Sequence, residues 1–137
     1  MTTDPSVVRS VAISAADLVA ALEATESGEA VTVLRVTPPF SGRMRGRIHV
    51  VQGDADAETL HVPPAALVDQ SAPSYPTPDE TADDLREASD DEYSVERHRE
   101  YHQRRVREWR ERLPDHVVDA VCLPAVGHEI TISLLGP

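Results

Sequence analysis

The stretch Ala-Val-Thr-Val-Leu-Arg-Val-Thr-Pro-Pro-Phe-Ser-Gly-Arg-Met-Arg-Gly-Arg-Ile-His-Val-Val-Gln, residues 30–52, decides the fold. Its first part, residues 30–37, is rich in β-branched side chains and stops at two prolines, which predicts a strand. After a turn, apolar side chains alternate with arginine and histidine through residues 43–52, which predicts a second strand. Residues 58–62 predict a third. Because short turns join the three, we expect an antiparallel meander.

The residues on either side of this stretch predict helices and further strands. Ser14 has Asp17 three residues on and precedes an apolar stripe at helical spacing, so it is the expected N-cap of a helix that stops near Gly28. Prolines, and eight acidic residues between Asp79 and Glu92, mark residues 69–92 as an exposed connector. The remaining predicted elements are strands at 7–13 and 128–135, a helical turn after Pro63-Pro64, a helix near 78–88, a long helix near 90–112 and a helical turn at 115–121.

These elements predict an α+β fold in a single domain, residues 1–137, with an antiparallel β-meander, a separate C-terminal strand and the helices on one face. Residues 15–68, a helix followed by strongly bent strands, also resemble an Sm-like or SH3-like small barrel, to which the rest would be a helical extension. The predicted segments are a β-α-β-β-β portion at 1–70, an acidic proline-containing connector with a short helix at 71–92, a long basic amphipathic helix at 93–113, and a turn and strand at 114–137.

An arginine stripe is the first candidate site. In a strand over residues 43–52, alternate side chains share a face at intervals of about 6.6 Å, and guanidinium groups in such a row suit the phosphates of a nucleic acid. The alternative is a solvated sheet face on which each arginine pairs with a local carboxylate, the simpler interpretation in so acidic a chain. However, residues 37–52 contain no Asp or Glu. The candidate contact residues are Arg35, Arg43, Arg45, Arg47 and His49, with His61 on the following strand.

One narrow apolar face of the predicted long helix is the second candidate. At about 100° per residue, Val95, Val106, Trp109 and Leu113 align with two histidines, while seven arginines and four glutamates cover the other faces. The simplest interpretation is a structural helix beside the acidic connector. The alternative is an interaction face for another helix, including a second copy of the chain.

The two aligned histidines, His98 and His102, are the third candidate. Histidines at i and i+4 can chelate one metal ion. The glutamate at position 100 lies one place later than in the zincin motif His-Glu-x-x-His, so that chemistry is not indicated. The alternative is that both histidines lie in a semi-polar packing seam beside Trp109.

The composition bears on where the protein works. The chain has no lysine, and its formal net charge is −11. Self-repulsion of this size weakens at molar salt, where the screening length falls to about 3 Å. The composition therefore resembles that of cytosolic proteins from salt-accumulating halophiles; a GC-rich genome explains the arginine but not the carboxylates. The single cysteine fits a reducing interior. We expect a cytoplasmic protein without a membrane partner, because no stretch approaches about 18 apolar residues.

The common catalytic and cofactor motifs are missing from the sequence. It contains no Gly-x-Gly-x-x-Gly, no P-loop, no Gly-x-Ser-x-Gly and no lysine for a Schiff base. We therefore expect a non-enzymatic binding or regulatory module without a cofactor, which contacts an anionic partner such as nucleic acid through the arginine stripe. The alternatives are a protein-interaction module that uses the long helix, and a histidine metal site.

Overall fold

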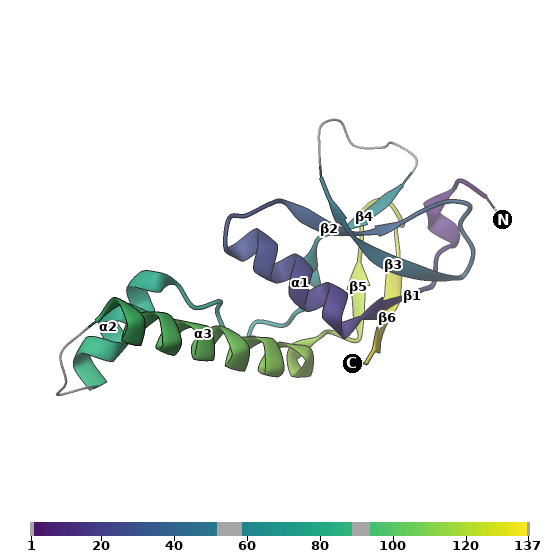
Figure 1. The fold of residues 1–137 in the computed structure, drawn as a ribbon. Coiled ribbons are helices and arrows are strands. Elements are labelled where there is room, and N and C mark those ends of the chain that lie inside the picture. The colour runs from purple at the N-terminus through teal and green to yellow at the C-terminus, as the bar shows by residue number, and fades with distance from the viewer. Residues whose placement is uncertain (1, 52–58, 89–93, 137) are drawn as a thin grey trace.

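The computed structural model describes residues 2–51, 59–88 and 94–136. It confirms the α+β class: helices accompany one six-stranded sheet whose strand order is β4-β2-β3-β1-β6-β5 (Figure 1). The strands are β1 (Ser10–Ser14), β2 (Thr32–Val36), β3 (Arg43–Val50), β4 (Leu60–Val62), β5 (Ala120–Cys122) and β6 (Glu129–Leu135), and the helices are α1 (Ala15–Glu26), α2 (Pro78–Ala88) and α3 (Val95–Arg112), with 3₁₀ turns η1 (Pro5–Val7), η2 (Pro64–Leu67) and η3 (Leu113–His116).

The strand order corrects the predicted meander. β2 and β3 are antiparallel, as expected, but β4 pairs with β2 rather than with β3. The cause is β1, which runs parallel to β3 along its other edge, so that β4 takes the free edge of β2. β1 is also parallel to β6, so the predicted separate C-terminal strand is part of the same sheet. Residue 52, at the end of the predicted second strand, and residue 58, at the start of the third, lie outside the described residues.

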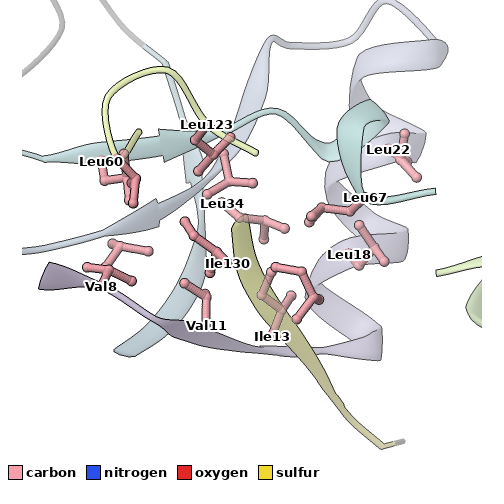
Figure 2. Packing of buried hydrophobic residues seen from close by; sticks show 14 of the residues in the cluster. Val8, Val11, Ile13, Leu18, Leu22, Leu34, Leu60, Leu67, Leu123 and Ile130 are labelled. Carbon is pink, nitrogen blue, oxygen red and sulfur yellow. The ribbon is translucent and has the colours of Figure 1, made fainter. Parts of the chain in front are cut away.

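The sheet curls around a single, mainly aliphatic core that also contains Phe40 and Trp109, with α1 packed against the inner face. Ser14 Oγ accepts a hydrogen bond from Asp17 N at 3.0 Å, which confirms the predicted cap, and Gly28, just past the helix, has φ +78. Figure 2 shows side chains from the helix and from several strands meeting in one interior. Those labelled include Leu18 and Leu22 of α1, Val11 and Ile13 of β1, Leu34 of β2 and Ile130 of β6.

A short latch joins the segments next to the two edge strands. Val68, after β4, forms an antiparallel bridge with Val117, before β5. Asp69 N donates to His116 O at 2.9 Å, and Val118 N donates to Leu67 O at 2.8 Å. The result is a half-barrel, so the alternative of a small barrel holds only for the curl of the sheet. The two parallel pairings of β1 distinguish it from an antiparallel barrel.

The α2–α3 hairpin projects from the sheet body (Figure 1). α2 packs mainly against α3, whereas α1 contacts β1, β2 and β3. The helices near 78–88 and 90–112 were therefore predicted well, although residues 89–93 lie outside the described residues. The turn predicted at 115–121 is instead the 3₁₀ turn η3 followed by strand β5.

Gly46 is the close-packed point of the sheet. Gly46 of β3 lies opposite Ile13 of the neighbouring strand β1. A Cβ at position 46 would lie 3.3 Å from Ile13 Cγ1 and 3.3 Å from Val11 Cγ1. The first half of β3 pairs with β1 and the second half with β2, so the strand changes partners at this residue. The missing side chain lets the aliphatic residues of β1 and β2 pack directly onto the backbone of β3.

Replacing Gly46 with valine should therefore destabilise the fold. The added carbons would overpack the core, which costs about 1–3 kcal/mol of unfolding free energy. Chemical denaturation of Gly46→Val against wild type measures this cost. Gly42→Ala is the matched control, because its Cβ would meet only Arg9 Cγ, at 4.0 Å, and should change the unfolding free energy by less than about 0.5 kcal/mol. Equal stability of Gly46→Val and wild type would contradict this packing.

Candidate functional site

The outer face of β3 carries three arginines in a row. Met44 and Gly46 face the core, so Arg43, Arg45 and Arg47 project from the opposite face, and all three are exposed. α1 covers the inner face, and α3 packs mainly against α2 and η3. The arginine row thus points away from the helix that lies on the sheet.

Neighbouring strands extend this row across the sheet. Arg35 of β2 lies directly opposite Arg47, and on its other side it lies opposite His61 of β4. His49 is the next outward residue along β3, and its ring centroid lies 5.9 Å from that of His61. The sequence predicted that these side chains share one face of the sheet, and the register of the strands places them there. We call Arg35, Arg43, Arg45, Arg47, His49 and His61 the outer basic face.

On the β1 side, the row is flanked by small side chains. Ser10 lies beside Arg43 and Ala12 beside Arg45. One strand further, Thr131 and Ser133 of β6 occupy the same registers. Small neighbours leave the flank of the arginine row sterically open. Sequence patterns did not indicate this strip, because they do not reveal that β1 and β6 pair beside β3.

Charge pairing separates these arginines from Arg105 and Arg110 of α3. Within the described residues, the side chains of Arg35, Arg43, Arg45 and Arg47 make no salt bridge and no hydrogen bond. Asp17, the carboxylate nearest to β3 in these contacts, instead accepts a hydrogen bond from Ile48 N at 3.4 Å. The alternative of an internally paired face is therefore not found in this part of the chain.

The surroundings of His49 disfavour the charged form of its imidazole. Partial desolvation and the nearby charges of Arg35 and His61 lower the pKa of His49. His61 Nε2 lies 3.1 Å from Thr59 Oγ1. The face thus holds two imidazoles next to permanent positive charge.

The predicted apolar interaction face of α3 needs correction. Val106, Trp109 and Leu113 are buried in the core of the same chain, and only Val95 is largely exposed, at 67%. Trp109 Nε1 donates to Pro73 O at 2.9 Å, and its ring meets Tyr75 edge-on at 4.9 Å. The helical periodicity correctly indicated an apolar face on α3. This face packs against the proline-containing segment and α1 of the same chain rather than against another molecule.

The histidine pair on α3 faces α2. Thr81, fully buried, has its Oγ1 2.9 Å from both His98 Nε2 and His102 Nδ1. The same hydroxyl donates to the carbonyls of Thr77 and Pro78 at 3.2 Å, so it can accept from both rings. Desolvation, then the charges of His98 and Arg105, lower the pKa of His102. This is the packing-seam alternative, with α2 as the partner.

Among the described residues, no cluster of three or more His, Cys, Asp and Glu side chains is arranged to hold a metal ion. Nor does any helix in the described ranges combine the length and apolar character that a membrane span needs.

Comparison with known families accounts for nearly the whole chain. A family model described as "Domain of unknown function (DUF8009)" matches residues 1–136. The chain belongs to this family. Searches of curated proteins and of solved structures gave no match. The function of this DUF8009 domain must therefore be inferred from its own geometry.

One contact of the DUF8009 domain was not predicted. Glu23 of α1 accepts two hydrogen bonds from Arg110 of α3, from Nε at 2.6 Å and from Nη2 at 2.7 Å. These hydrogen bonds are the main cause of the lowered pKa of Glu23. Beside the pair lies an open groove of about 520 Å³, floored by alanines of α1 and Pro114. No local signal joins residues 87 positions apart, so sequence patterns could not have revealed this pair.

Trp109→Ala should destabilise the DUF8009 monomer rather than dissolve a dimer. Removing a buried tryptophan and its hydrogen bond costs about 3–5 kcal/mol. Denaturant unfolding measures the loss, and light scattering gives the mass. Val95→Ala, on the same helical face but exposed, is the control and should leave both unchanged. A wild-type dimer that Trp109→Ala converts into a stable monomer would contradict this account.

Proposed function

We propose that this protein is a non-enzymatic binding module whose outer basic face contacts the phosphate backbone of a nucleic acid. The observation that carries the proposal is the set of four arginines on one sheet face that have no carboxylate partner among the described residues. Guanidinium groups bind phosphate bidentately, and in a row they can follow a chain of phosphates.

The contrast with Arg105 and Arg110 of α3 supports this proposal. Arg105 Nη1 donates to Asp84 Oδ2 at 2.7 Å, and Arg110 makes a bidentate pair with Glu23. The chain has 24 Asp and Glu residues for 13 arginines, so carboxylate partners are abundant. The arginines of the sheet have no such partners among the described residues, which leaves their guanidinium groups available to an external anion.

The overall charge of −11 does not prevent such binding. At about 0.15 M salt the screening length is about 8 Å, so an incoming phosphate senses mainly the charges nearest to it. Those charges are positive on the outer basic face. The distant carboxylates slow the approach of a polyanion more than they weaken the contact itself.

The residue types on the face favour backbone contact over base recognition. None of the strands contains Phe, Tyr or Trp, the side chains on which bases stack. The face offers guanidinium groups, two imidazoles and small flanking side chains. We therefore propose a binding mode that tolerates any base sequence and depends strongly on salt.

The same chemistry relates to the proposed halophilic setting. Molar salt weakens phosphate contacts, because binding releases condensed counterions. A module that works in such a cell would need several arginines acting together, as the outer basic face provides. The absence of lysine and the excess of carboxylates support that setting.

Arg45→Glu should weaken binding of a single-stranded oligothymidylate without unfolding the protein. Four phosphate contacts predict a slope of about −3 for the logarithm of affinity against the logarithm of salt concentration. The variant should bind at least about tenfold more weakly, with a slope shallower by about 1. Fluorescence anisotropy gives the affinities, over the range of KCl in which circular dichroism shows folded protein.

Arg99→Glu is the matched control, because Arg99 is an exposed arginine of α3 and the charge change is identical. It should bind like wild type. Equal losses for both variants would reduce the effect to net charge, and unfolding of Arg45→Glu would make that arginine structural. Either result, or absence of binding by wild type at every salt concentration, contradicts the proposed function.

A further inference from the structure

Positive charges lie close together at one end of the outer basic face, an arrangement that is unfavourable for the stability of the fold. Arg35 lies directly opposite Arg47 on one side and directly opposite His61 on the other. Directly opposite side chains in an antiparallel pair have Cβ atoms about 5 Å apart, and like charges in such pairs are destabilising. None of the described carboxylates bonds to this group to offset the repulsion.

The two histidines of this end lie close enough to share a ligand. Their ring centroids are 5.9 Å apart, and the ring planes are inclined by 44°. His49 is half-buried at a register next to Arg47 along β3, while His61 lies beside Arg35 on β4. An oxyanion above this part of the sheet could therefore meet two guanidinium and two imidazole groups at once.

Resting on the proposed function, we infer that Arg35, Arg47, His49 and His61 form a phosphate seat whose histidines take up protons when the phosphate binds. The seat makes the contact with nucleic acid pH-dependent. In the empty face, desolvation and neighbouring cations oppose protonation of His49 and so lower its pKa. A bound phosphate adds negative charge that cancels this opposition and gains two further charge-assisted hydrogen bonds.

The groups that face His49 determine the sign of the pH dependence. β2 contributes Arg35, β3 contributes Arg47, and β4 contributes His61. Desolvation and these cations lower the pKa of His49 when no anion is bound. The acidic positions 54, 56 and 58 of the connecting segment lie outside the described residues. Because binding raises the histidine pKa values, affinity should increase as pH falls from about 8 to about 6.

The first readout is the affinity for a fluorescent oligothymidylate at pH 8 and pH 6, at one KCl concentration. A single proton taken up on binding increases affinity by up to about tenfold per pH unit. We expect wild type to gain at least about tenfold at pH 6, and the double variant His49→Gln, His61→Gln to lose most of this gain. His116→Gln is the matched control. His116 belongs to the latch, where its Nδ1 lies 3.2 Å from Ser71 Oγ and 3.4 Å from Asp69 Oδ1, and it is not part of the outer basic face.

The second readout is the imidazole titration of each histidine by NMR, with and without the oligothymidylate. The pKa values of His49 and His61 should rise when it binds, and that of His116 should not. Binding with equal affinity at both pH values and unmoved histidine pKa values would overturn the phosphate seat but leave the proposed function standing. Absence of binding at either pH would overturn both.

Discussion

The structure depends on the contact between the backbone of β3 and the side chains of its two neighbours. Because Gly46 has no side chain, Val11 and Ile13 of β1 pack onto β3 from the parallel side, and Leu34 of β2 packs from the antiparallel side. β3 can therefore join two differently oriented halves of one curled sheet. The same alternation that turns Gly46 inward turns Arg45 and Arg47 outward, so the core and the outer basic face are two consequences of one strand.

Two arginines of α3 differ from the arginines of the sheet in their charge pairing. On α3, Arg105 bonds to Asp84 of α2 and holds the two helices of the hairpin together. Arg110 bonds to Glu23 of α1 and attaches the hairpin to the body of the protein. On the sheet, arginines face each other across strands without such partners in the described residues. Surface ion pairs contribute about 0–1 kcal/mol each, so leaving a few arginines unpaired costs little stability. An exposed, unpaired arginine row is thus compatible with a marginally stable aliphatic fold.

Local patterns predicted more of the fold than long-range pairing did. The cap at Ser14, the strands on both sides of the Pro38-Pro39 turn and the helix α3 follow from propensities and periodicity, which act within a few residues. The position of β4 beside β2, and the parallel contacts of β1, depend on which edges remain free after folding, and periodicity carries no such information. At the site, alternation along β3 predicted the arginine row. His61 was expected on a strand beside β3, whereas the register places it beside Arg35 on the other side of β2. The partner of Trp109 could not be predicted, because a periodic apolar face does not specify whether its own chain covers it.

The central claim is that the guanidinium groups of β3 are open to an external polyanion. The most direct measurement is the arginine side-chain NMR spectrum during addition of a single-stranded oligothymidylate. We expect the Nε signals of Arg43, Arg45 and Arg47 to shift, while those of Arg105 and Arg110, held in internal ion pairs, stay in place. Unmoved β3 signals, or shifts concentrated on α3, would contradict this claim.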